Sequence, residues 1–354
     1  MILSDQWYKT GYGATLQALG NKKLSWETTN ALDLGVETRM WNGLLYVKAS
    51  YYNKRTVDLI NDVTIPSSTG FTTYIDNIGE VENKGFELDF RSELIKRQNL
   101  YLAVFANLAH NKNKILKVAE SLKAYNDLVD DFFEDAHETV EGRRDEPHTK
   151  YVEGGSMNSI WGMQSLGIDP ATGDEVFVRK NGALSKTWKS SEQVVIGNTE
   201  PKAQGAFGMN MTYRNFSLYA TFMYQFGGQQ YNSTLVSKVE NADIYDSNVD
   251  RRVLTDRWTK PGDVAKYKKL TNGVANIETT NPTSRFVQDY NWLSLNSITL
   301  GYDFRQPWIE KLGLSMLRFE VGANELFRWS SVEQERGLSY PFARSMNFSL
   351  KANF

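Results

Sequence analysis

The chain has 354 residues, which is enough for one large domain or two ordinary ones. Its 40 Lys+Arg nearly balance 42 Asp+Glu for a formal net charge of -2, so the sequence lacks the basic excess that favours nucleic-acid binding. The absence of cysteine excludes disulfides, thiolate zinc sites and cysteine nucleophiles. The chain combines 18 Tyr, 18 Phe and 9 Trp with a mean hydropathy of -0.48, which is typical of an all-β protein whose strands have one wet face.

The sequence predicts neither a signal peptide nor a membrane-spanning helix. Residues 1–10 lack a basic segment followed by an apolar run. The longest uncharged stretch, between Arg214 and Lys238, is interrupted by Gln, Gly and Asn, and no helix of that composition would span a bilayer.

From residue 26 onward, apolar and polar residues alternate with the period of a β-strand. Leu32, Leu34 and Val36 share one parity, for example, while Asp33 and Glu37 occupy the other. The alternating segments have about the length of a tilted membrane-crossing strand, roughly 9–11 residues. We predict nine strands, at about 26–41, 43–60, 79–97, 99–116, 203–213, 215–230, 284–305, 315–329 and 344–354.

The connections between these strands alternate strictly between short and long. Alternation within strands also fits a soluble sandwich, whose apolar face looks into a core. A sandwich has no reason to place every long loop at one end, whereas an outer-membrane barrel has short periplasmic turns and long extracellular loops. The sequence therefore favours an antiparallel up-and-down transmembrane β-barrel. The long extracellular loops are predicted at about 61–78, 117–202, 231–284 and 330–343.

Nine strands do not make a complete barrel of this kind. If the tight turns are periplasmic, the first strand starts outside, and an odd set cannot form the usual even-stranded barrel. Two unpaired edges could not sit in lipid either, because every backbone group there must be paired. We therefore expect residues 1–354 to be the C-terminal portion of a larger barrel.

Eight short strings are distributed along nearly the whole chain. They are LSWETTNALDLGVE (24–37), YYNKRTVDLI (51–60), NIGEVENKGFELDF (77–90), GIDPATGDEVF (167–177), IGNTEPK (196–202), YQFGGQQYN (224–232), RWTKPGD (257–263) and PTSRFVQDYNWLSLNSITLGYDF (282–304). In this order they resemble the SusC/RagA-like TonB-dependent outer-membrane transporters.

This resemblance implies a barrel of roughly 22 strands around a plug, of which the chain is similar to the last two-fifths. It implies uptake of oligosaccharides or peptides across the outer membrane of a Gram-negative bacterium. A surface lipoprotein of the SusD type and the TonB complex are the implied partners. The signal sequence, TonB box, plug and early strands of the family have no counterpart in these residues, so this chain is not expected to transport alone.

No catalytic or metal motif stands out. His110, His137 and His148 lack the HExxH spacing, and neither a G-x-S-x-G elbow nor a phosphate loop is present. His137 and His148 belong to a charged loop and are predicted to be ordinary solvated residues. The acidic stretch 127–141 lacks the glycine of a calcium-binding EF-hand loop and is predicted to be a solvated loop. A glycosidase needs two carboxylates across one cleft, which these loops do not reveal. We predict no enzyme activity, no cofactor and no metal.

Aromatic residues in the loops and at strand ends are the candidate functional residues. Those in or beside the long loops could stack on sugar faces, although packing between loops is the competing explanation. Aromatics near strand ends are typical of the girdles of membrane barrels, or of a buried core edge in a soluble protein. The candidate substrate-binding residues are Trp161, Tyr231, Trp258 and Trp292, and the candidate girdle residues are Trp41, Tyr213, Trp308 and Trp329.

The sequence ends on a bare aromatic ring. Phe348, Leu350 and Phe354 share the apolar parity of the last strand. In outer-membrane barrels, as in the family that the chain resembles, such an ending is an address for the barrel-assembly machinery. A last strand that simply pairs and buries its apolar face is the compatible alternative.

Together these features predict the C-terminal part of an outer-membrane nutrient transporter that faces lipid on its outside. A soluble, secreted all-β carbohydrate-binding module is the main alternative, and an all-β glycosidase is a third.

Overall fold

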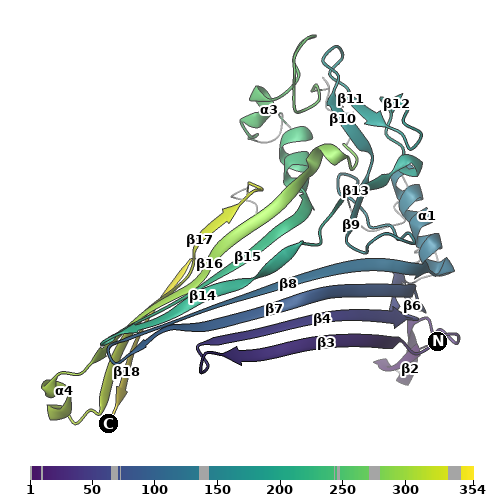
Figure 1. The fold of residues 1–354 in the computed structure, drawn as a ribbon. Helices are drawn as coiled ribbons and strands as arrows, with labels where there is room; N and C mark the ends of the chain where they lie inside the picture. Colours follow the sequence, from purple (N-terminus) through teal and green to yellow (C-terminus); the bar gives the residue numbers. More distant parts are fainter. Residues whose placement is uncertain are drawn as a thin grey trace.

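A single antiparallel sheet of nine long strands forms the body of the molecule (Figure 1). The computed structural model describes residues 2–8, 11–64, 71, 73–134, 143–242, 244, 248–270, 280–333 and 344–354. The sheet has the order β18-β17-β16-β15-β14-β8-β7-β4-β3, so its strands lie side by side in the order in which they follow one another along the chain. Its members are β3 (Thr28–Met40), β4 (Leu45–Val57), β7 (Gly79–Arg97), β8 (Leu100–Val118), β14 (Ala203–Tyr213), β15 (Phe216–Tyr231), β16 (Val287–Phe304), β17 (Met316–Ser330) and β18 (Ser345–Asn353).

All nine predicted strands are confirmed, with ends that differ by only a few residues. The sheet curves but stays open in this chain, and β3 and β18 form its two edges. Tight turns and the short helix α4 (Pro307–Lys311) lie at one end of the strands, while all the long connections lie at the other end (Figure 1). We call these the turn end and the loop end.

One face of the sheet is apolar from edge to edge. Directly paired residues of antiparallel strands point to the same face, so the pairing register identifies its rows. One row runs Leu102, Met211, Leu218, Leu300, Val321 and Phe348, and the next runs Leu100, Tyr213, Phe216, Tyr302, Phe319 and Leu350.

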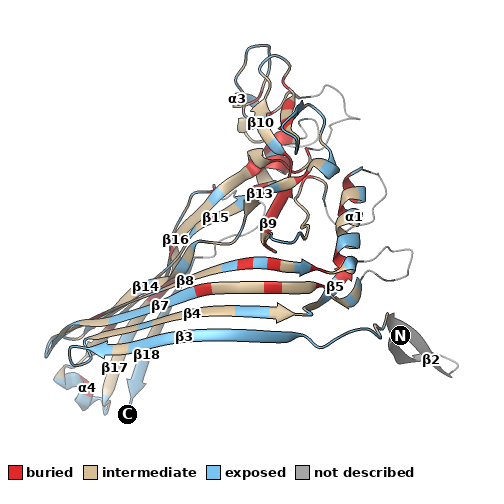
Figure 2. Ribbon diagram, turned by 45° about the vertical axis from the view of Figure 1, so that its right-hand side comes forward, coloured by how far each residue is buried: buried red, intermediate tan, exposed pale blue. Residues whose placement is uncertain are grey.

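No second sheet covers this face within the described residues. Val36 is 69% exposed and Phe348 is 68% exposed, and buried residues gather instead in the loops and at the loop ends of the strands (Figure 2). The sandwich alternative is therefore wrong for this chain, because a sandwich would bury its apolar face against another sheet. We call this face the outer face.

The opposite face, which we call the lumen face, is polar. Asp33, Glu37, Glu87 and Asp89 lie on it, and rows farther along carry Asn, Ser and Thr. Glycines there let long side chains cross from one strand to another. Arg318 on β17, for example, lies over Gly301 of β16 and donates a hydrogen bond to Ser217 Oγ on β15 at 2.7 Å.

The turn end carries three of the four aromatic residues that the sequence predicted for a girdle. The first hairpin turn is tight, with positive φ at Trp41, Asn42 and Gly43. Trp41, Tyr213 and Trp308 lie at this end with partly or largely exposed rings, whereas Trp329 lies near the loop end of β17. Among the described helices, none is long and apolar enough to cross a membrane.

The loops hold the buried cores of the molecule. Small sheets and short helices fill them, and three clusters of buried apolar residues stabilise them, the largest around Val236, Val239 and Phe286. The loop elements are β5 (Ile60–Thr64), β6 (Thr73–Asn77), α1 (Glu120–Glu134), β9 (Ser159–Gly162), β10 (Gln164–Ile168), β11 (Glu175–Val178), β12 (Leu184–Ser185), η2 (Ser190–Glu192), β13 (Val194–Asn198), α2 (Ser233–Leu235), the π-helix η3 (Val236–Glu240), α3 (Arg252–Thr255) and η4 (Ser284–Phe286). A separate hairpin of β1 (Ile2–Tyr8) and β2 (Gly11–Ala18) precedes the large sheet.

The acidic stretch 127–141 differs from its prediction. Residues up to 134 belong to α1, which buries Leu122, Val129, Phe132 and Phe133 and is not a solvated loop. The prediction failed because apolar residues at helical spacing lie among the carboxylates. His137 and the rest of the stretch lie outside the described residues.

Candidate functional site: the lumen mouth and its loops

Four side chains form a polar and aromatic cluster on the lumen face where the sheet meets the loops. The guanidinium of Arg328 lies over the ring of Trp292, 4.7 Å from its centroid, and donates a hydrogen bond to Tyr290 Oη at 2.9 Å. The indole Nε1 of Trp292 donates to Gln225 Oε1 at 3.2 Å. We call Gln225, Tyr290, Trp292 and Arg328 the mouth cluster.

A bulge in β15 sets the geometry of this cluster. The pairing between β15 and β16 shifts register between Gln225 and Gly228, and Gly227 adopts a positive φ of 79° that suits glycine. The Gly227 amide donates to Asn291 Oδ1 at 2.7 Å, which fixes the bulge to β16. The mouth cluster therefore combines flat ring surfaces with amide and guanidinium groups on a rigid wall, an arrangement suited to binding polar ligands with ring faces.

The other three predicted substrate-binding aromatics lie in the packing of the loops. Tyr231 belongs to the largest apolar cluster, with its ring 6.1 Å from that of Phe286, and Trp161 is buried in β9. The indole of Trp258 donates to the Pro170 carbonyl at 2.9 Å. Of the four residues, Trp292 alone faces the lumen, and the structure does not bring the four together.

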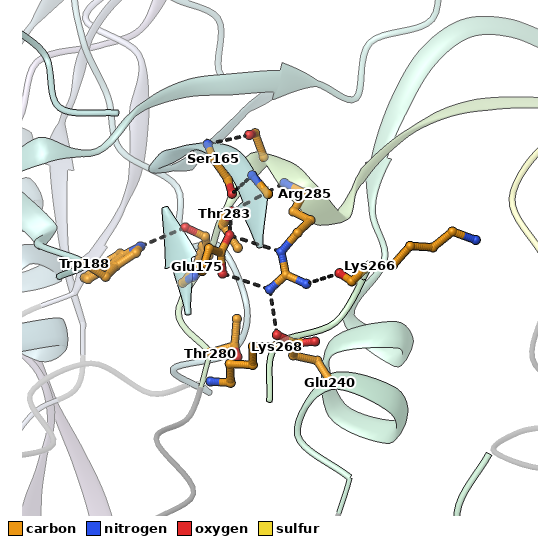
Figure 3. Close-up of polar contacts among 12 residues, drawn as sticks. Ser165, Glu175, Trp188, Glu240, Lys266, Lys268, Thr280, Thr283 and Arg285 are labelled. Atoms are coloured by element: carbon orange, nitrogen blue, oxygen red, sulfur yellow. Dashed lines mark hydrogen bonds and ion pairs between the residues drawn. The ribbon is translucent and has the colours of Figure 1, made fainter. Parts of the chain in front are cut away.

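We call the described parts of 119–202 and 232–286 the loop assembly. A buried ionic network joins its two loops (Figure 3). Arg285 contacts Glu175 Oε2 at 2.8 Å and Glu240 Oε1 at 2.6 Å. These three side chains are 11%, 5% and 0% exposed, and Thr283 Oγ1 donates to Glu175 Oε1 at 2.7 Å.

The charges of this network compensate each other in a poorly solvated place. Burial by itself lowers the pKa of Arg285, but the two carboxylates outweigh burial and raise it overall, so the guanidinium stays charged. Arg257 lies nearby, and burial lowers its pKa as the largest effect. Its side chain donates to the carbonyls of Val253 at 3.1 Å and Lys268 at 2.7 Å. Two arginines thus organise the backbone and the carboxylates of the loop assembly.

A second contact ties the loop assembly to the lumen face. Glu200, which lies just before β14, accepts hydrogen bonds from Asn111 Nδ2 at 2.5 Å and from the amide of Asn113 at 3.0 Å. Tyr52 crosses over Gly85 and donates to Asn111 Oδ1 at 2.9 Å. The carboxylate of Glu200 therefore anchors the loop assembly to β8, and Asn111 connects this contact to Tyr52 on β4.

In the part of the chain that the structure describes, no group of three or more His, Asp or Glu side chains converges. His148 was expected to be solvated but is partly buried, with its ring 4.8 Å from Phe132 and 5.4 Å from Phe133. Burial lowers the pKa of His148 more than its other contacts raise it. His110 lies on the outer face beside Phe86.

Phe348, Leu350 and Phe354, the candidate assembly signal, lie at the end of the chain on or beside β18. Phe348 and Leu350 pair with Val321 and Phe319 on the outer face of β17, and Phe354 follows β18 with 94% of its side chain exposed. Their assembly role stays a prediction.

The family model "TonB dependent receptor-like, beta-barrel" matches residues 3–144. The TonB-dependent receptor P26 of Formosa agariphila is 27% identical over 90% of this chain and 32% of its own length. The TonB-dependent receptor SusC of Bacteroides thetaiotaomicron is 22% identical over 84% of this chain and 28% of its own length. The chain thus spans about a third of the length of the curated relatives it matches.

Solved structures share the fold. A structure of the RagAB peptide transporter aligns with a TM-score of 0.71 over 94% of this chain and 35% of its own, at 18% identity. The RagAB peptide importer in the "open-open" state gives a TM-score of 0.73 over 100% of this chain and 38% of its own, also at 18% identity. The matching model, the curated relatives and the common fold together support the resemblance, because residues 3–144 match a TonB-dependent receptor barrel and most of the chain is similar to SusC and to the RagAB structures.

Proposed function

We propose that this chain forms part of the wall and the extracellular loops of a transporter that imports oligosaccharides or peptides across the outer membrane of a Gram-negative bacterium. The observation that carries this proposal is the division of the sheet into an apolar outer face and a polar lumen face. A wall of this kind faces lipid on one side and a water-filled passage on the other. The loop end is then extracellular and the turn end periplasmic.

The mouth cluster is the proposed substrate contact. It lies at the entrance to the lumen, below the loop assembly, and Trp292 offers an aromatic face in a polar setting. Trp258 and the buried Trp161 and Tyr231 would act indirectly, by holding the loops in place.

The partners are part of the proposal, and the similarity to SusC and to RagAB supports the lipoprotein and the TonB complex. A SusD-like surface lipoprotein would contact the loop assembly, whose surface carries exposed apolar side chains at Leu166, Leu184, Leu254 and Val264. The TonB complex would act through a region of the receptor outside these residues. The barrel-assembly machinery would read the last strand.

Growth of the source cells tests this function. A deletion strain is complemented with wild type, Trp292→Ala or Trp329→Ala and grown on neutral oligosaccharides, acidic oligosaccharides or peptides as the carbon source. Trp329 is the matched control because its pairing with Leu293 places it on the outer face. We expect Trp292→Ala to slow growth at low concentrations of one substrate class, while Trp329→Ala grows like wild type. Equal growth of deletion and wild-type strains on all three would contradict the transporter proposal.

A further inference from the structure

The outer face contains an apolar depression of about 320 Å³ in the middle of the sheet. Phe90 of β7, Val104 and Ala106 of β8, and Phe207 and Met209 of β14 line it together with Phe222 of β15. Two rows of the sheet, one above the other, thus form its walls.

The depression exists because one small residue interrupts a row of phenylalanines. The pairing register places Phe90 beside Ala106, Ala106 beside Phe207, and Phe207 beside Phe222. The rings of Phe207 and Phe222 stack with centroids 5.1 Å apart and planes within 8°. Ala106 therefore forms the floor of a slot between Phe90 on one side and this stacked pair on the other.

The chemistry of the slot selects its occupant. None of its lining side chains carries a polar atom, so it cannot pair the hydroxyls of a sugar or the amides of a peptide. The rows on its turn-end side, such as Leu102 beside Met211, are also apolar. The slot is thus continuous with the face that would contact lipid, where hydrocarbon chains are the surrounding medium.

The position of the slot along the strands indicates which leaflet of the membrane it faces. Val104 and Ala106 lie four and six residues beyond Leu100, the first residue of β8, which places the slot roughly 13–20 Å along the strand from the turn end. For strands tilted by about 40° in a hydrocarbon core about 30 Å thick, this is the half nearer the turn end. That half is the periplasmic leaflet in the orientation proposed above.

We propose that this slot holds one acyl chain of a phospholipid from the periplasmic leaflet. The inference rests on the proposed membrane location. The bound chain would fill the gap over Ala106 and pack against the stacked rings of Phe207 and Phe222.

Native mass spectrometry of the intact receptor tests the proposal, after extraction from its own outer membrane and extensive delipidation. We expect wild type to retain one phospholipid per barrel, and Ala106→Phe, which fills the slot, to lose it at least tenfold more readily. Ala49→Phe is the matched control, because Ala49 lies on the outer face beside Leu88 and is separated from Ala106 by the whole of β7. It should retain lipid like wild type.

The following outcomes would refute binding of a phospholipid acyl chain in the slot. Equal lipid retention in wild type and Ala106→Phe would overturn the proposal, as would retention of lipopolysaccharide in place of phospholipid. A wild-type dimer that Ala106→Phe converts to a monomer would show that a second copy occupies the slot. If Ala106→Phe fails to assemble, wild type is photo-crosslinked with a phospholipid carrying a reactive acyl chain, and labels outside 86–108 and 203–222 would refute the site. An outer-membrane barrel that binds no lipid would refute this inference alone and leave the proposed transport intact.

Discussion

Replacing Arg285 by methionine removes a cation that forms ion pairs with two buried carboxylates. Glu175 and Glu240 would then remain 5% and 0% exposed without that partner. Breaking a buried ion pair by removing one member costs about 3–5 kcal/mol, since an uncompensated charge stays behind. The cost falls on the packing of the two loops, because β11, η3 and η4 carry the three residues.

Hydrogen exchange of the intact receptor measures this cost locally. A loss of 3–5 kcal/mol corresponds to exchange roughly 100- to 5,000-fold faster. The reporters are the amides of 159–162 and 194–198, because Ile160 and Ile196 pack in the apolar cluster of Phe286, the residue next to Arg285. The amides of β7 and β8 should not change.

Two controls distinguish the cost of an uncompensated buried charge from the cost of losing an ion pair. Lys186→Met removes an exposed cation that pairs with Asp169 at 2.9 Å, and such surface pairs contribute about 0–1 kcal/mol, so exchange should change less than about fivefold. The triple variant Glu175→Gln, Glu240→Gln and Arg285→Met removes all three charges and should recover much of the protection. Exchange in Arg285→Met within fivefold of wild type would refute the reasoning.

Three further predictions concern the wall, the pH response and the last strand. In Gly301→Val, the new Cβ would come within 2.8 Å of the Arg318 guanidinium, so the barrel should unfold in heated detergent several degrees below wild type. An unchanged unfolding temperature would contradict the contact of Arg318 across Gly301 with Ser217. Burial lowers the pKa of His148, so the packed state disfavours its protonation and the packing of 120–134 should weaken as pH falls below about 6.5. Hydrogen exchange of that helix at pH 7.5 and 5.5, corrected for intrinsic rates, should show this loss, and His148→Gln should remove most of it; an equal pH response in His148→Gln would assign the effect elsewhere. Phe354→Ser should lower the amount of assembled barrel several-fold at equal synthesis, as measured by heat-shifted mobility in gels, and undiminished assembly would remove its predicted role.

The strands were predictable because their pattern is local. A period of two needs only neighbouring residues, and tight turns such as that at Trp41 have a short sequence signature. The membrane interpretation also came from local features, namely the alternation of short and long connections. The outer and lumen faces followed directly from parity.

The loop assembly was not predictable in the same way, because its contacts join distant residues. Glu175 and Arg285 are 110 residues apart in sequence, and Glu200 reaches Asn111 over a separation of 89. Glu175, Glu200 and Arg285 lie within strings that carried the family resemblance and Asn111 does not, so the resemblance pointed to three of these residues but not to their contacts. The helix α1 was missed because its carboxylates concealed its apolar spacing.

The aromatic candidates show the same limit. Trp161, Trp258 and Trp292 are similar as sequence signals, yet β9 buries the first, a turn holds the second against Pro170, and the third faces the lumen. The role of a loop aromatic depends on the register of the neighbouring strands. That register is set by contacts between distant segments and cannot be read from one of them.

An antibody raised against residues 143–202 tests most directly whether this chain is part of an outer-membrane wall whose loop end is extracellular, as we propose. It is applied to intact source cells and to separated cell fractions. We expect labelling of intact cells and a band in the outer-membrane fraction whose mobility shifts on heating. A soluble band of 40.4 kDa, with no labelling of intact cells, would contradict it.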